Sequence, residues 1–325
     1  MASATDLTTR LGPLTLRNPV LAAAGTFGYG EEFAEHVPLE RLGAVVTKTL
    51  TLAPRDGNAP PRLVETPAGM LNAVGLSNMG IERFLVERWP RLRTRNVPVV
   101  ISILGDTREE FLELARRVEA AGGAAALELN LSCPNVGSST ARSGPTLSGV
   151  EGVGVVGHEL VAQDPAATEA IVAAVRKAVK LPLIAKLAPD VSDIRPIAQA
   201  AERGGADILT VANTFLGLAI DAQTRRSRLG RPMGGLSGPA IKPLALYRVW
   251  RAAQAVRIPI IGLGGIRTGE DAAEFLLAGA RAVAVGTAHF ADPRASLRVV
   301  EELARLARRQ GLARIEEWVG AYATG

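Results

Sequence analysis

Cysteine, histidine and aromatic residues are scarce in this sequence of 325 residues. The single cysteine, Cys133, excludes an internal disulfide and fits a reducing compartment. The three histidines, His36, His158 and His289, show no metal-ligand spacing, so we expect no metal site. Aromatic residues make up 4% of the chain, too few for a protein that binds nucleic acid by stacking on its bases.

Long hydrophobic runs are missing as well. No apolar stretch approaches the ~20 residues that cross a bilayer, and the first residues lack the basic and apolar regions of a secretory signal. We therefore expect a cytoplasmic protein that binds neither membrane nor nucleic acid. The composition, 47% hydrophobic and 21% charged, is that of a globular protein, and the net charge of +5 suits an anionic substrate or a phosphate-bearing cofactor.

Eight short apolar runs alternate with amphipathic, helix-like stretches. The runs are continuous rather than alternating in polarity, as expected of parallel strands buried on both faces. This alternation predicts an α/β fold, a (β/α)8 TIM barrel forming a single domain over residues 1–325. An open, doubly wound sheet is the alternative, and the count of eight favours the barrel. The strands are expected at residues 19–25, 44–50, 98–104, 126–132, 182–189, 207–214, 259–265 and 282–287.

Helices are expected between these strands, at residues 166–180, 192–205, 239–255 and 269–279, and from a capping-box spacing at Thr107 and Glu110. Residues 7–16 predict an N-terminal hairpin that turns at Gly12. Two long loops, residues 51–79 and 137–164, follow predicted strands two and four. The carboxyl ends of barrel strands carry the active site, so both loops are expected at its mouth.

Glycines close the last two predicted strands. Gly264 and Gly265 lie at the end of strand seven, and Gly286 and Thr287 lie at the end of strand eight. Glycine lets backbone N–H groups approach an anion, and these two loops are the usual phosphate site of such barrels. A single pair would indicate only a tight turn, but the repetition at consecutive strands favours phosphate binding.

Two lysines lie in apolar strands of a chain that has few lysines and many arginines. Lys48 ends strand two and Lys186 lies in strand five. A buried charge must be paired or must face the mouth of the barrel. Either lysine alone could simply reach solvent. Together they indicate a Schiff base, a carboxylate anchor or the stabilisation of negative charge on a cofactor.

Amide side chains gather at the predicted strand ends. Asn130 lies near the end of strand four, Asn213 near the end of strand six, and Asn72 in the loop after strand two. Amides both donate and accept hydrogen bonds, which suits a flat ligand with carbonyl and N–H edges. Cys133 follows a strand end among polar residues and precedes a proline. That setting is typical of an exposed thiol acting as a base or nucleophile rather than of a buried one.

These motifs, in order from about residue 11 to residue 293, resemble the dihydroorotate dehydrogenase family, and specifically its class 1B, the NAD-linked type with a catalytic FMN subunit. Cysteine rather than serine at the position of the base supports the resemblance. The motifs are residues 72–76, 128–136, 212–214, 234–243, 260–266 and 285–287.

The resemblance implies one FMN per chain and the oxidation of (S)-dihydroorotate to orotate in pyrimidine biosynthesis. By this resemblance Cys133 is the catalytic base, which removes a proton from C5 while hydride leaves C6 for the flavin. The implied substrate-binding residues are Lys48, Asn72, Ala73, Val74, Gly75, Leu76, Asn130, Asn213 and Thr214. The implied cofactor-binding residues are Ala24, Gly25, Lys48, Thr49, Ser102, Asn130, Lys186, Ala212, Gly238, Gly264, Gly265, Gly286 and Thr287.

The sequence departs from the family at two places. Ser102 stands where the family usually has an asparagine that contacts the flavin, and the loop after Val136 is longer and lacks the usual Phe-Gly. The resemblance also implies a homodimer that joins a partner subunit carrying FAD and a [2Fe–2S] cluster, giving a heterotetramer. A single cysteine cannot ligate such a cluster in this chain.

Two other functions are compatible with parts of the sequence. A barrel aldolase or isomerase with Lys186 as a Schiff base would explain the lysines and glycines, but neither the amides nor Cys133. A scaffold barrel without catalysis would not need so many polar groups at its strand ends.

Overall fold

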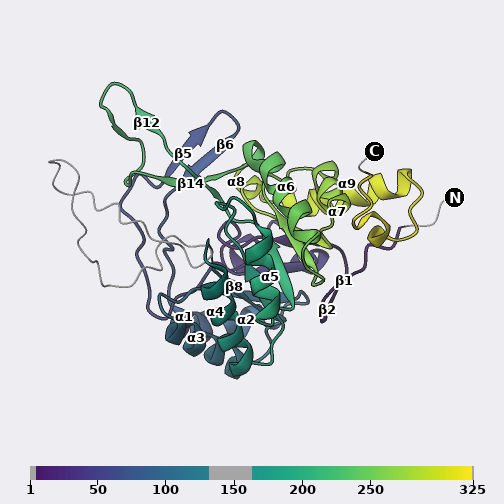
Figure 1. Cartoon of the computed structure of the whole chain (residues 1–325), viewed down its shortest axis with the longest axis horizontal. Helices are drawn as coiled ribbons and strands as arrows, with labels where there is room; N and C mark the ends of the chain where they lie inside the picture. Colours follow the sequence, from purple (N-terminus) through teal and green to yellow (C-terminus); the bar gives the residue numbers. More distant parts are fainter. Residues whose placement is uncertain (1–4, 132–162, 324–325) are drawn as a thin grey trace.

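Eight parallel strands form a closed barrel in the computed structural model, which describes residues 5–131 and 163–323 (Figure 1). Every strand falls within one of the eight predicted runs, so the barrel prediction is confirmed. Around the barrel the strands follow the order β10-β15-β16-β3-β4-β7-β8-β9. Their bounds are β3 (Val20–Ala22), β4 (Ala44–Val46), β7 (Val99–Ile103), β8 (Ala126–Asn130), β9 (Leu183–Lys186), β10 (Ile208–Val211), β15 (Ile260–Leu263) and β16 (Ala282–Val285).

Helices surround the barrel, and their ends follow local sequence signals. Thr107 accepts a hydrogen bond from the Glu110 backbone, and Thr268 and Asp271 form a reciprocal capping box. Glu110 departs from the predicted box, because its carboxylate binds the Asp106 backbone N–H instead. The helices are α1 (Ile81–Glu87), α2 (Trp89–Leu92), α3 (Arg108–Ala121), α4 (Pro165–Ala178), α5 (Arg195–Arg203), α6 (Lys242–Ala253), α7 (Gly269–Leu277), α8 (Ala288–Ala291) and α9 (Ala295–Arg309), with 3-10 turns η1 (Glu31–Phe33), η2 (Leu39–Arg41), η4 (Pro239–Ile241) and η5 (Ile315–Trp318).

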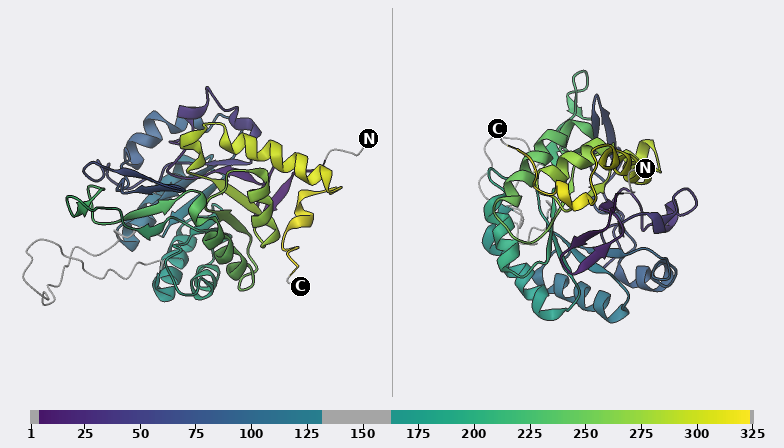
Figure 2. Two further views of the ribbon diagram at one scale, coloured as in Figure 1. Left: turned by 90° about the horizontal axis from the view of Figure 1, so that it is seen from above. Right: turned by 90° about the vertical axis from the view of Figure 1, so that its right-hand side faces the viewer.

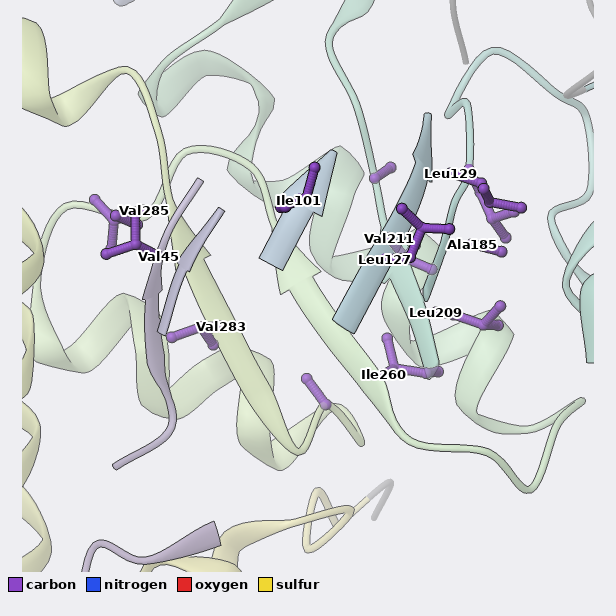
Figure 3. Packing of buried hydrophobic residues seen from close by; sticks show 14 of the residues in the cluster. Val45, Ile101, Leu127, Leu129, Ala185, Leu209, Val211, Ile260, Val283 and Val285 are labelled. Carbon is purple, nitrogen blue, oxygen red and sulfur yellow. The ribbon is translucent and has the colours of Figure 1, made fainter. Parts of the chain in front are cut away.

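The main core lies between the strands and the helices. Strand residues such as Leu127, Leu129 and Leu209 point out of the barrel into this layer (Figure 3). A smaller apolar cluster fills the inside of the barrel, where Ile184, Ile208 and similar residues pack on one another. The continuous hydrophobic runs are explained by this burial on both faces.

The N-terminal hairpin plugs one end of the barrel. Strands β1 (Thr9–Leu11) and β2 (Leu14–Leu16) pair antiparallel, as predicted. Leu11 and Leu16 are fully buried members of the cluster inside the barrel. The turn at Gly12 lies against Asp207 and Pro259, just before β10 and β15 begin. The amino ends of the strands are therefore closed, and the opposite end is left to bind a ligand.

The long loop predicted after strand two contains strands that the sequence reading missed. Within residues 51–79, β5 (Leu63–Thr66) and β6 (Gly69–Asn72) form a hairpin. This hairpin joins β14 (Gly234–Ser237) and β11 (Phe215–Gly217) in a sheet of order β11-β14-β6-β5, while β12 (Ile220–Asp221) and β13 (Arg226–Ser227) pair beyond it. The sheet stands away from β1 and β2 (Figures 1 and 2).

The second long loop, residues 137–164, lies outside the described residues up to position 162. Among the helices that the structure does describe, none is long and apolar enough to span a membrane.

His289 is a buried titratable group in this core. The residue is 2% exposed, and its ring packs against Phe27 with 4.7 Å between the ring centroids. Its Nε2 lies 2.8 Å from the Ser296 hydroxyl. Burial lowers the pKa of His289 to about 4, against weaker opposing effects of the Gly286 backbone and of Asp292.

Acidification should therefore destabilise the fold through His289. Between pH 6.5 and 4 the unfolded chain binds a proton at this residue and the folded chain does not. The free energy of unfolding therefore decreases as the pH is lowered, and at pH 4 it is about 3 kcal/mol below its value at neutral pH. His289→Gln removes the titration and keeps a group able to bind Ser296, so its stability should fall less. Denaturant unfolding across this range measures the difference, with the exposed His36→Gln as control. Equal decreases in the free energy of unfolding in wild type and His289→Gln would show that His289 does not cause the acid destabilisation.

Candidate functional site

A cavity of about 470 Å³ opens at the carboxyl ends of the strands. Residues from the ends of β3, β9, β10, β15 and β16, from the start of η4 and from the β5–β6 hairpin line it. The predicted site residues that it brings together are Ala24, Lys186, Ala212, Asn213, Thr214, Gly238, Gly264, Gly265, Gly286 and Thr287.

A second cavity, of about 340 Å³, lies at the amino ends of β15 and β16. None of the predicted site residues lines it. The mouth at the carboxyl ends is therefore the candidate site.

The glycines after β15 and β16 are needed for different reasons. Gly265 has a φ of +72°, and a Cβ there would lie 2.8 Å from the Lys242 backbone nitrogen and 2.9 Å from the Gly238 carbonyl oxygen. A side chain at Gly265 would thus be strained and would collide with backbone. At Gly286 the nearest atoms to a Cβ are 3.8 Å away, so this glycine leaves room for a ligand instead.

Lys186 brings a nearly buried cation to the cavity. It is the last residue of β9 and is 5% exposed. Among the described residues it makes no ion pair or hydrogen bond through its ammonium group. A buried, unpaired charge is costly, so this position favours a ligand that brings negative charge or electron-rich atoms.

Lys48 lies two residues beyond the end of β4 and does not line the cavity. Its backbone N–H donates to the Gly28 carbonyl. Burial lowers the pKa of the half-buried Lys48 ammonium, and the charge of Glu32 opposes that shift. Gly25, which has a φ of +87°, has open space where a side chain would stand.

Polar side chains form a buried layer beneath the mouth. Ser102, with no exposed surface, lies 2.9 Å from the Thr49 hydroxyl and donates to Glu128. Asn130, 6% exposed, donates to Thr49, and Asn213 donates to Asn130. The structure thus places Ser102 and Thr49 inside the barrel, below the residues that line the cavity.

Residues 72–76 begin with the last residue of β6 and do not line the cavity. The Asn72 amide donates to the Gly235 carbonyl at 3.2 Å. A Cβ at Gly235 would lie 2.2 Å from the Thr214 hydroxyl and 3.4 Å from the Asn72 amide nitrogen. Strand β14 therefore brings these two predicted substrate ligands to one place. Ala73, Val74, Gly75 and Leu76 complete the segment, and Gly75 and Leu76 both have positive φ.

Cys133, the predicted base, lies outside the described residues. Within the described residues no cluster of three or more metal-ligating side chains occurs.

The hairpin β5–β6 also lines the cavity, which confirms that the loop of residues 51–79 lies at the mouth, although the sequence did not predict its strands. Residues Thr66 to Met70 face the cavity, and the Thr66 hydroxyl is buried without a partner among the described residues. Two short strand-like runs around Pro67-Ala68 are a hairpin signal that could have revealed it. Arg267 also lines the cavity. Its place just after the glycine pair could have marked it as an anion ligand.

A family model described as dihydroorotate dehydrogenase matches residues 6–147 and 153–306 of the chain. The match covers more than half of the sequence and all eight barrel strands.

Full-length relatives agree with this match. A protein of Pelobacter propionicus, named dihydroorotate dehydrogenase B (NAD(+)), catalytic subunit, is 49% identical over 97% of this chain and 98% of its own length. One of Desulforudis audaxviator with the same name is 50% identical over 95% of this chain and 94% of its own. A relative from Solibacter usitatus, 48% identical over 97% and 98%, is provisionally named dihydroorotate dehydrogenase A (fumarate).

Proposed function

The chain belongs to the dihydroorotate dehydrogenase family, and we propose how the mouth of its barrel performs that family's reaction. The reaction is the flavin-dependent oxidation of dihydroorotate to orotate in pyrimidine biosynthesis. The observation that carries the proposal is one cavity that joins the nearly buried Lys186, which has no ion pair among the described residues, to the glycine ends of β15 and β16. The aldolase reading of Lys186 gains no support from these relatives.

The residues of the cavity fit FMN. Gly264, Gly265, Gly286 and Thr287 would hold its phosphate, because their backbones can approach an anion closely. Arg267 lines the same part of the cavity and would add charge. Backbone groups of Ala24, Gly25, Ala212 and Gly238 would line the ring system. When bound, FMN supplies the acceptor for hydride.

Lys186 would lie beside the flavin and offset the negative charge that builds up on reduction. The cation is already in place and nearly buried, so little reorganisation is needed when the charge develops. Lys48, Thr49 and Asn130 complete the proposed cofactor contacts, and Ser102 would support them from below through Thr49.

The substrate's polar edge would meet amide and hydroxyl groups. Asn72 and Thr214 converge at Gly235, and Asn130 and Asn213 are hydrogen-bonded to each other. Together with Lys48 for the carboxylate and residues 73–76, they form the proposed binding frame. Cys133 is proposed as the base that removes the C5 proton, because a thiol near a polar strand end can reach the thiolate form.

A partner subunit is proposed to carry electrons away. Two relatives are named as NAD(+) catalytic subunits, and the one cysteine of this chain cannot hold an iron–sulfur cluster alone. We infer a homodimer that joins two partner subunits with FAD and [2Fe–2S], giving a heterotetramer. Fumarate is the alternative acceptor, because the Solibacter usitatus relative carries it in its name.

Gly265→Asp should abolish FMN binding, because it adds a carboxylate where the phosphate is proposed and a side chain where backbone lies within 3 Å. Gly311→Asp is the matched control. Its φ of +74° imposes the same backbone strain, but it is exposed and lies away from the cavity. Flavin absorbance per purified chain is the measurement. Wild type that never takes up FMN, even on reconstitution, would refute the proposal.

Cys133→Ala should keep FMN yet reduce it more slowly with dihydroorotate, by a factor on the order of 10²–10⁴. In wild type the rate should rise with pH towards the thiol's ordinary pKa of about 8.5, since the thiolate is the active form. Anaerobic stopped-flow bleaching of the flavin measures both. Near-normal reduction in the variant would place the base elsewhere.

The isolated chain should reduce NAD slowly with dihydroorotate and should reduce an artificial dye readily. Co-expression with an iron–sulfur partner subunit should restore NAD reduction. Steady-state assays with NAD, fumarate and dye, each with and without partner, test this. Rapid reduction of NAD or fumarate by the chain alone would contradict the proposed partner subunit but not the proposed flavin chemistry.

A further inference from the structure

A chain of hydrogen bonds runs from a buried carboxylate to the mouth of the barrel. Glu128 on β8 is 2% exposed, and its Oε1 accepts from the Ser102 hydroxyl at 3.0 Å. The Ser102 and Thr49 hydroxyls are 2.9 Å apart, and the Asn130 amide donates to Thr49 at 3.3 Å. The other carboxylate oxygen, Oε2, accepts from Thr210 at 3.1 Å.

The two ends of this chain fix its direction. A carboxylate can only accept, and an amide NH2 can only donate. Ser102 therefore donates to Glu128, Thr49 donates to Ser102, and Asn130 donates to Thr49. Each hydroxyl donates once and accepts once, so every link is satisfied.

Reversing the Asn130 amide would break this order. Its oxygen would then face Thr49, so that an acceptor would stand at each end of the hydrogen-bond series, the amide oxygen at one end and the Glu128 carboxylate at the other. Thr49 would donate to Asn130 and Ser102 to Glu128, leaving two oxygens 2.9 Å apart with no proton between them. The loss of a hydrogen bond between buried groups makes the reversed amide unfavourable.

The same order continues towards the cavity. The Asn213 amide nitrogen lies 3.5 Å from the Asn130 oxygen, and the Asn213 oxygen accepts from the Thr214 backbone at 2.8 Å. Both amides thus have one orientation compatible with the chain. Asn213 and Thr214 line the cavity, so the direction imposed at Glu128 reaches the mouth.

We infer that Glu128 is a positioning residue, whose buried carboxylate sets the orientation of the Asn130 and Asn213 amides through Ser102 and Thr49. It has no contact with the ligand in this role. The inference rests on the proposed function for its ligand, orotate, whose carbonyl and N–H edges require amides of defined orientation.

Ser102→Ala tests the inference, because Ser102 has no exposed surface and any effect on a ligand must pass through Thr49 and Asn130. Thr210→Val is the matched control. It removes the other hydroxyl from the same carboxylate, at a residue that is also buried, and leaves the hydrogen bonds from Ser102 to Asn130 intact. Both variants lose one buried hydrogen bond, so both should unfold at lower temperature.

The measurement is the dissociation constant of orotate for the FMN-loaded protein, followed by flavin absorbance. Ser102→Ala should weaken binding roughly tenfold, about 1.4 kcal/mol, while Thr210→Val stays within about twofold of wild type. Equal effects of the two variants would overturn the inference. If wild type itself fails to bind orotate, the proposed function is what fails.

A second pair of variants and a measurement without ligand distinguish a loss of orientation from misfolding. Thr49→Val should weaken orotate binding as Ser102→Ala does, and Thr49→Ser, which keeps the hydroxyl, should restore it. In ¹⁵N-labelled protein the side-chain NH2 signals of Asn130, assigned with Asn130→Asp, should move in Ser102→Ala and stay in Thr210→Val. Unchanged chemical shifts in Ser102→Ala would contradict the proposed series of hydrogen bonds, whether or not orotate binds.

Discussion

Closure of eight parallel strands into a barrel is the constraint on which the rest of this structure depends. A closed sheet has no free edge, and parallel strands bring all their carboxyl ends to one rim. Side chains far apart in sequence, such as Lys186 and Gly265, therefore line a single cavity. The N-terminal hairpin seals the opposite end with Leu11 and Leu16, so the rim is where a ligand can enter.

The inside of the barrel changes in character along its axis. Near the hairpin it is filled by Ile184, Ile208 and other aliphatic residues. Nearer the rim the inward positions of the same strands carry Glu128, Lys186 and Thr210, all at most 5% exposed. Buried polar groups of this kind are stable only when they are paired. Glu128 is paired by hydroxyls, whereas Lys186 makes no such contact among the described residues, which suits a ligand-binding role.

Ser102 departs from the family pattern, and its side chain makes hydrogen bonds within the barrel instead. The family's usual asparagine would reach towards the flavin, but the shorter serine is directed to Thr49 and Glu128. The polar layer below the site is thereby tied to the amides above it. Relatives of almost equal identity carry different electron acceptors in their names, NAD(+) and fumarate.

The sequence by itself determined the eight strands, the hairpin and the glycine ends, because burial on both faces and tight backbone turns leave local signals. It also determined the family, through motifs such as residues 72–76. Only the tertiary structure decided that β5 and β6 join a sheet at the mouth, since β14, which pairs with β6, lies far away in sequence. It also decided that Ser102 and Thr49 lie beneath the site, because hydrogen-bond partners on different strands leave no mark in the local sequence.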